Sequence, residues 1–326
     1  MTVAFVVTVA VLGGLLLFLV HEIRRPIHVS KWDRSPLWRK RFRVTLATVF
    51  LLLVGIVGWA FFIEPNRLVI RHETLQINNW PSELSNLKIA VLSDMHIGSS
   101  FINEEKVRYI VEQTNQLQPD MIVILGDYIA GNGRASHRVE PEVFGPMLKG
   151  FRAPLGVYSV LGNHDWWYDG RLVREALEQN GIKVLENETF KLDVRRDQAQ
   201  GTEEAATPLW LVGLADLWTR PQRIDETLAQ VPEGAPMIAL AHNPDVFPRL
   251  PQSVPLLLAG HTHGGQVRFP FIGSVIHPSN YGQRYARGHI YESGHHLFVT
   301  TGIGTSIVRV RFNVPPEIVL LTVKSQ

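Results

Sequence analysis

Five short apolar runs, each leading into side chains of metal-binding types, constrain the fold of this 326-residue chain more than any other feature. The runs are KIAVLSD (88–94), MIVILGD (121–127), GVYSVLG (156–162), PMIALAH (236–242) and PLLLAGH (255–261). Uninterrupted apolar runs of this length are typical of buried strands. Between the first two runs, apolar residues recur at helical spacing after Asn103, a residue type that favours a helix start. The order predicts an α/β sandwich in which the loops at the carboxyl ends of the strands gather into one site.

The residues at these strand ends form a set that suits a divalent metal. The set comprises Asp94, His96, Asp127, Asn163, His164, Asp165, His242, His261 and His263. Taken singly, an Asp after a strand is often a helix cap, and a buried His is more often hydrogen-bonded than metal-bound. Taken together, carboxylates, imidazoles and an amide oxygen suit Mn²⁺, Fe or Zn²⁺. The chain contains no cysteine, which excludes Cys-ligated zinc and thiol nucleophiles.

The five blocks occur in the order D-x-H, G-D, G-N-H-D, H and G-H-x-H. In this order the sequence resembles the calcineurin-like metallophosphoesterase superfamily over residues 88–326. The neighbourhoods LSDMHIG, GNHDWW, AHNPD, GHTHGGQ and RFNVPPEI are most similar to the bacterial membrane-anchored phosphoesterases of that superfamily. The resemblance implies a metallophosphoesterase-type β-sandwich flanked by helices, in an α/β/β/α arrangement.

The resemblance also implies a ligand set for two divalent metal ions, Mn²⁺, Fe or Zn²⁺. Asp94, His96 and His263 would hold the first ion, and Asn163, His242 and His261 the second, with Asp127 as the bridge. A carboxylate can bridge cations about 3.5–4 Å apart, and such a pair clamps the attacking and leaving oxygens of a phosphoester. The expected reaction is attack by a metal-bound hydroxide. The catalytic residues would be Asp127, Asn163, which also touches the phosphate, and His164, which donates a proton to the leaving oxygen.

One departure from the superfamily pattern affects His164. In its protein phosphatases, the G-D block continues with an Asp that orients the acid histidine and an Arg that grips phosphate. Here Tyr128 and Ile129 follow Asp127 instead. This argues against a phosphoprotein phosphatase and leaves Asp165 as a candidate for orienting His164.

Two long uncharged segments, residues 3–20 and 44–63, are long enough to cross a bilayer as helices. The alternatives are a cleaved signal peptide for the first and a buried core helix for the second. The loop 21–43 between them carries eight Lys/Arg and two Asp/Glu, a net charge of +6, which leaves −4 for the rest of a chain whose total is +2. Short basic loops stay in the cytoplasm. We therefore expect a membrane anchor at 1–84, with 64–84 as a linker, and an extracytoplasmic catalytic domain at 85–326, held at the inner membrane by two spans.

The expected function is a membrane-anchored, dinuclear metal-dependent phosphodiesterase or phosphatase acting on an envelope or lipid-linked phosphoester. The alternatives are a UDP-diacylglucosamine pyrophosphohydrolase, if the domain is cytoplasmic, and a catalytically inert membrane sensor. A DNA exonuclease ranks last and no nucleic acid partner is expected, because the chain outside the basic loop is acidic. Several residues are candidates for substrate or lipid contacts, with core packing or a solvated surface as the alternative: Trp166, Trp167, Tyr168, Arg268, Phe269, Phe271, Ile272 and Arg284.

Overall fold

The computed structural model describes residues 36–131, 139–195 and 206–326, together with residues 13–14, 16–18, 20–21 and 24. The chain divides into two compact units, Met1–Ile63 and Glu64–Gln326. The described part of the first unit consists mainly of helix α2 (Pro36–Gly58), which continues as a π-helical turn at Trp59–Ile63.

One helical segment in the described residues, Lys40–Asn66, is long and apolar enough to cross a membrane. It contains the predicted second span, 44–63. The predicted first span, 3–20, and most of the basic loop 21–43 lie outside the described residues, so the prediction of two spans stays a prediction.

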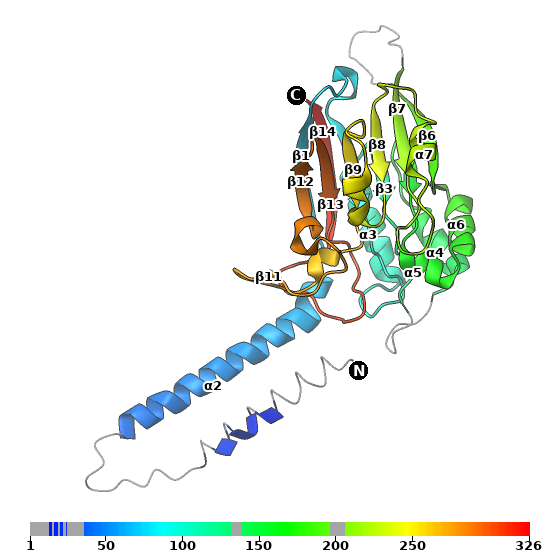
Figure 1. The fold of residues 1–326 in the computed structure, drawn as a ribbon. Coiled ribbons are helices and arrows are strands. Elements are labelled where there is room, and N and C mark those ends of the chain that lie inside the picture. Colours follow the sequence, from blue (N-terminus) through cyan, green and yellow to red (C-terminus); the bar gives the residue numbers. More distant parts are fainter. Residues whose placement is uncertain are drawn as a thin grey trace. The chain divides into compact units, whose positions relative to one another are not determined.

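The second unit contains two six-stranded mixed sheets and a small hairpin (Figure 1). The first sheet has the strand order β1 (Val69–Ile77), β14 (Glu317–Ser325), β2 (Leu87–Leu92), β3 (Met121–Ile124), β4 (Val157–Ser159) and β5 (Ile182–Val184). The second sheet has the order β12 (Gly288–Glu292), β13 (His295–Val299), β9 (Leu256–Ala259), β8 (Met237–Leu240), β7 (Thr207–Gly213) and β6 (Glu188–Val194). Strands β2 to β5 are parallel, and so are β7, β8, β9 and β13. The hairpin pairs β10 (Arg268–Phe269) with β11 (Gly273–Ser274).

Helices cover the outer faces of the two sheets. The α-helices of this unit are α3 (Glu104–Gln116), α4 (Pro141–Leu148), α5 (Asn163–Tyr168), α6 (Gly170–Gln179) and α7 (Ile224–Leu228). Short 3-10 turns lie at Glu64–Asn66, Ser82–Leu84, Pro244–Arg249, His263–Gly265 and Gly282–Tyr285. Helix α3 begins where the sequence predicts, because the Asn103 side chain accepts a hydrogen bond from the Lys106 backbone N–H.

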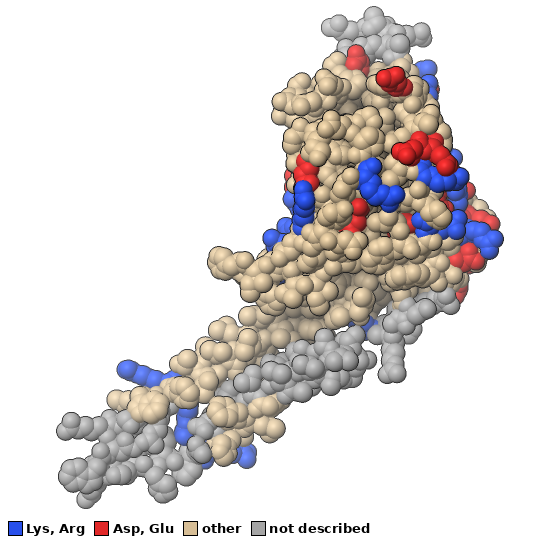
Figure 2. All heavy atoms as spheres, viewed as in Figure 1, with Lys and Arg blue, Asp and Glu red and all other residues tan. Residues whose placement is uncertain are grey.

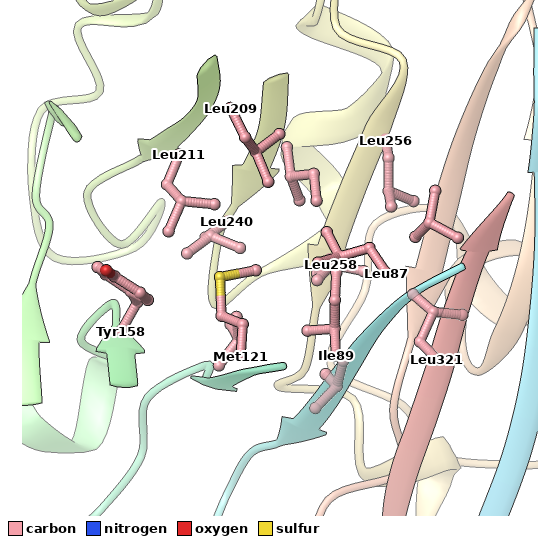
Figure 3. Packing of buried hydrophobic residues seen from close by; sticks show 14 of the residues in the cluster. Leu87, Ile89, Met121, Tyr158, Leu209, Leu211, Leu240, Leu256, Leu258 and Leu321 are labelled. Carbon is pink, nitrogen blue, oxygen red and sulfur yellow. The ribbon is translucent and has the colours of Figure 1, made fainter. Parts of the chain in front are cut away.

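The core between the sheets follows from strand alternation. In β2, Ile89 and Val91 pack into the space between the sheets, whereas Ala90 and Leu92 face the helices. The second sheet alternates in the same way, with Leu256 and Leu258 of β9 in that central cluster (Figure 3). Because both faces of the central strands β3, β8 and β9 are buried, these strands read as continuous apolar runs. The mixed α/β sheets with flanking helices confirm the predicted fold class.

Residues 64–84, for which the sequence predicts a linker, belong to the compact second unit. Strand β1 pairs in parallel with β14 along its whole length, and Trp80 is buried in the central core. The segment VIRHETLQI forms an edge strand in which more and less exposed residues alternate, and its partner is the last strand of the described chain. Sequence reasoning had no local signal for a pairing over that separation.

Candidate metal centre

The structure brings the predicted site residues together at the carboxyl ends of the strands in both sheets. Asp94 and His96 follow β2, Asp127 follows β3, and Asn163 begins α5 after β4. From the second sheet, His242 follows β8, and His261 and His263 follow β9. The structure forms three groups whose potential ligand atoms lie within 4.8 Å of one another: Asp94, His96 and His263; Asp127, His242 and His261; and His96, Asp127 and His164.

The first cluster consists of Asp94, His96 and His263, and we call it the Asp94 cluster. The Nε2 atoms of His96 and His263 are 3.1 Å apart, and Asp94 Oδ1 lies 3.4 Å from His263 Nε2. All three side chains are buried. Their potential ligand atoms lie within 4.8 Å of one another, close enough to hold one cation.

The second cluster, which we call the His242 cluster, consists of Asn163, His242 and His261. His242 Nε2 lies 3.2 Å from Asn163 Oδ1 and 3.0 Å from His261 Nδ1. Asp127 lies between the clusters, with its Oδ2 atom 3.7 Å from His96 Nε2 and 3.4 Å from His242 Nε2. One oxygen of the Asp127 carboxylate therefore lies near a potential metal-binding nitrogen from each cluster.

The backbone at this site adopts an uncommon conformation. Asp94, His96, Asp127, His261 and His263 all have positive φ, between 46° and 69°. Non-glycine residues rarely do so, and such strain persists where the surrounding structure enforces it, most often at functional sites. The turns also require glycine, because a Cβ at Gly162 would collide with the Asp127 carboxylate and one at Gly260 with the Ser93 hydroxyl.

Hydrogen bonds outside the clusters orient two of the imidazoles. His96 Nδ1 lies 3.1 Å from the Ile129 carbonyl, and His242 Nδ1 lies 2.7 Å from the Leu125 carbonyl. In the neutral ring, Nδ1 then carries the hydrogen and Nε2 directs its lone pair into the site, as in metal-bound histidines.

The donor set fits divalent metal binding. Asp94 Oδ1 is buried without a hydrogen-bond partner, although it faces His263. An orphaned buried carboxylate oxygen costs free energy unless a cation or water satisfies it. With imidazole, carboxylate and amide donors and no thiolate, the seven residues offer ligands suited to Mn²⁺, Fe or Zn²⁺.

Burial and mutual charge separate the ionisation states of these residues. Burial lowers the pKa of both His96 and His261 to about 3, and it holds the pKa of His263 well below the usual range. Burial also opposes protonation of His242, but the charge and hydrogen bond of Asp127 outweigh it and raise the His242 pKa to about 10. Burial would raise the pKa of Asp127, yet His242 and His164 outweigh it and hold that pKa well below its usual range. Three imidazoles are therefore neutral at pH 7, the form in which a histidine can bind a metal, while Asp127 keeps its charge.

His164 lies beside the Asp94 cluster and is not oriented by Asp165. Its ring stacks edge-on against His96, with ring centroids 4.7 Å apart, and its Nε2 lies 3.5 Å from Ser306 Oγ. Its Nδ1 is buried and has no hydrogen-bond partner. The side chain that lies near Nε2 of His164 is Ser306, a residue that no motif singles out.

Asp165 instead stabilises the loop that presents Asp127. Its carboxylate accepts backbone N–H bonds from Asp127, Tyr128, Ile129 and Gly162, at 2.8 to 3.3 Å. The candidate role of orienting His164 was therefore wrong. The reason is that Asp165, the third residue of α5, points back toward the loop after β3, where backbone N–H groups have no partner within a strand or helix.

Two aromatic side chains cover the site. Trp167 is 60% exposed and its ring lies 4.8 Å from His164, while Trp218 is 48% exposed and lies 4.3 Å from His261. The two indoles are 6.5 Å apart. Of the other predicted aromatic contacts, Trp166 packs against Arg220 and Tyr168 donates to Glu140, so neither faces the clusters in these contacts.

Sequence reasoning missed the loop after β7, which carries Trp218 and Asp216. Asp216 is buried and one of its carboxylate oxygens has no partner. The run WLVGLAD (210–216) has the same form as the five predicted blocks, an apolar strand that ends in Asp, and could have revealed this loop. Arg284, a predicted phosphate contact, forms a two-point ion pair with Glu292 instead.

Comparison with known proteins agrees with this site. The family model for calcineurin-like phosphoesterases matches residues 87–265. The uncharacterized metallophosphoesterase YkuE of Bacillus subtilis is 31% identical over 283 residues, which is 86% of this chain and 94% of the relative. The phosphodiesterase YaeI of Escherichia coli is 28% identical and covers 87% of this chain and 98% of the relative. A transmembrane protein with metallophosphoesterase domain from Danio rerio is 28% identical, covering 87% of this chain and 63% of the relative.

These similarities and the site define a metallophosphoesterase. The chain belongs to the calcineurin-like phosphoesterase family, and it is a phosphoester hydrolase.

Proposed function

We propose that the chain is a membrane-anchored phosphodiesterase that uses two divalent cations, held by the Asp94 and His242 clusters. The observation that carries this proposal is the position of Asp127, one oxygen of which faces both clusters at 3.4 and 3.7 Å. Two cations bound there would polarise the phosphoryl oxygens and supply a nucleophile by lowering the pKa of water.

The chain's own residues supply orientation and charge. Asp127 is held by its backbone N–H bond to Asp165, and its second oxygen accepts a hydrogen bond from the His164 backbone N–H at 2.9 Å. The Asn163 amide lies beside His242 and can contact a phosphate oxygen. This arrangement is fixed before substrate binds, so little reorganisation is needed during the reaction.

His164 is the proposed general acid. Its ring lies between the Asp94 cluster and the exposed Trp167, where the leaving group of a bound phosphoester would emerge. Ser306 lies near Nε2 and helps to fix the ring plane. His164 would give its proton to the leaving oxygen as the P–O bond breaks.

The exposed indoles favour an ester with an apolar or aromatic group. Trp167 and Trp218 present ring faces and edges above both clusters, and such surfaces bind acyl chains or bases. The name of the Escherichia coli relative, a phosphodiesterase, supports a diester. A membrane tether raises the local concentration of lipid-linked phosphoesters, so we propose an envelope lipid as the substrate class.

Hydrolysis of paired chromogenic esters tests the reaction. The purified full-length chain is freed of metal and assayed on bis(p-nitrophenyl) phosphate and p-nitrophenyl phosphate, with Mn²⁺, Fe²⁺, Zn²⁺ or no addition. We expect metal-dependent hydrolysis with preference for the diester. Preference for the monoester would replace the diesterase proposal by a phosphatase, and no hydrolysis with any metal would support the inert sensor.

We further propose that the basic loop 21–43 stays in the cytoplasm and that the catalytic domain lies outside it. The charge of the loop supports this, since moving Lys and Arg across an energised membrane costs about 2.3 kcal/mol per charge per 100 mV. Because the chain has no cysteine, Ser30→Cys and Ser253→Cys can each be tested with a membrane-impermeant maleimide on intact cells. We expect labelling at position 253 only. Labelling at position 30 only would reverse the topology and favour the cytosolic UDP-diacylglucosamine substrate.

A further inference from the structure

The hairpin formed by residues 267–276, which we call the apolar hairpin, exposes large hydrophobic side chains to solvent. Phe271 at its tip is fully exposed, Ile276 is 80% exposed, and Phe269, Ile272 and Val275 are also exposed. Residues 269–283 contain no charged side chain, and the hairpin that projects beside the β11 label in Figure 1 is uncharged in Figure 2. Contiguous apolar surface of this kind marks an interaction site.

The base of the apolar hairpin is joined to the candidate metal centre. Ser274 Oγ donates to the carbonyl of Gly264 at 2.7 Å, and Gly264 directly follows His263 of the Asp94 cluster. The Gln283 side chain holds the hairpin by accepting from Ser274 N–H and donating to the Ile272 carbonyl. The apolar tip is therefore presented from a fixed base that adjoins the site.

The apolar hairpin also lies close to the residue at which the catalytic unit begins. Glu64 accepts a hydrogen bond from the Val314 backbone N–H at 2.6 Å. Two residues earlier, the Phe312 carbonyl accepts from Arg268 N–H, and the Phe312 ring is 6.0 Å from that of Phe269. Glu64 directly follows Ile63, the last residue of the first unit, and the Cα atoms of consecutive residues are about 3.8 Å apart.

We propose that the apolar hairpin inserts into the lipid interface of the membrane that holds the anchor helix. This inference rests on the proposed anchorage. If Lys40–Asn66 crosses a bilayer, Glu64 lies at its surface, and the neighbouring hairpin meets the same surface. Exposed Phe and Ile side chains bury favourably at the boundary of headgroups and acyl chains.

The bilayer fits the hairpin better than a second copy of the chain or a soluble protein does. The hairpin has few residues and no charged group in its tip, whereas specific protein interfaces combine an apolar centre with a polar rim. Arg268 flanks the tip and can meet anionic headgroups. Insertion would hold the loop of His261 and His263 at headgroup level, where a lipid phosphoester presents its phosphate.

Site-directed fluorescence on the full-length chain tests the proposal. Single cysteines replace Phe271, Ile276, Leu52 in helix α2, and Ser253, which is exposed before β9 at the opposite end of that strand from His261. Each variant is labelled with an environment-sensitive NBD probe and reconstituted in nanodiscs with or without nitroxide-labelled lipid. An unchanged melting temperature shows that each labelled variant is folded.

We expect nitroxide lipid to quench the probes at 271, 276 and 52, and iodide in the buffer to quench the probe at 253. Quenching at 52 but not at 271 or 276 would overturn the hairpin proposal and leave the anchor intact. A blue-shifted probe at 271 without lipid quenching would indicate a protein contact and would also overturn it. Loss of lipid quenching at 52 as well would refute both the anchor and the hairpin.

Discussion

The space between the two sheets and the site at their carboxyl ends are built by the same strands, yet they differ in almost every physical property. Within the sandwich, Leu258 is fully buried among apolar neighbours. Three residues later on the same strand and loop, His261 is buried with positive φ and one ring nitrogen without a partner. The change from Val91 to Asp94 at the end of β2 is of the same kind.

This difference shows that the residues that stabilise the fold and the residues that form the site occupy different parts of the same strands and their loops. The apolar alternation supplies the free energy of folding through burial. The strand ends offset part of that free energy with positive φ and with close-packed imidazoles and carboxylates, which a bound cation would compensate. Substitutions in the two regions should therefore have opposite signatures.

The largest expected effect on activity is that of Asp127→Asn. The bridge between the clusters loses its charge, so both metal affinities fall and hydrolysis is lost, while the fold is retained. The matched control is Asp193→Asn, which makes the same change on an exposed side chain of β6. Metal content and turnover are measured on both variants. Full activity in Asp127→Asn would break the assignment of the bridge.

His164→Ala should reduce turnover by about 10²–10⁴-fold on alkyl esters, because their leaving oxygen needs a proton. Nitrophenyl esters should lose much less, and metal content should not change. His72→Ala, on an exposed face of β1, is the control. Equal losses on both classes of ester would show that His164 positions the phosphate. Ser306→Ala should also lower turnover more on alkyl esters than on nitrophenyl esters, but by a smaller factor than His164→Ala. Equal losses of Ser306→Ala on the two classes of ester would show that Ser306 does not assist His164.

Leu258→Ala should lower the free energy of unfolding by about 2–5 kcal/mol, because it leaves a cavity between the sheets. The metal stoichiometry of the folded fraction should stay the same, which separates this variant from Asp127→Asn. Leu172→Ala on the exposed side of α6 should change stability by less than about 0.5 kcal/mol. Denaturant titration of the metal-free chains measures both. Loss of metal in folded Leu258→Ala would show that the two regions are not separable.

The smallest expected effect is that of Trp218→Ala. Removing one indole over the site should raise KM for esters with aromatic or acyl groups by up to about tenfold, equivalent to about 0.5–1.5 kcal/mol. Small dialkyl phosphates should be unaffected. Tyr109→Ala, at an exposed position of α3, is the control. Equal change for both ester classes would mean that Trp218 supports His261 and does not contact substrate.

The sequence predicted the strands and the clustering of the site residues because both follow from local pattern. Buried strands of a parallel sheet are apolar throughout, and their carboxyl ends meet at one edge. Thus Asp94, Asp127 and His242 were found from the residues that end their runs, and the structure brings them together.

The remaining features depend on contacts between distant segments. Ser306 reaches His164 across 142 positions of the chain, and Glu64 reaches Val314 across 250. No local spacing encodes such contacts. The role of Asp165 also escaped prediction, because the backbone donors that it satisfies become available only when β3 and β4 lie side by side.

Metal titration of the full-length chain tests the central claim most directly. The protein is stripped with chelator, then Mn²⁺ is added in steps while bound metal and diester hydrolysis are both measured. The site geometry predicts that activity reaches its plateau at two equivalents per chain and stays low at one. Full activity at one equivalent, unchanged by further metal, would contradict a dinuclear centre bridged by Asp127.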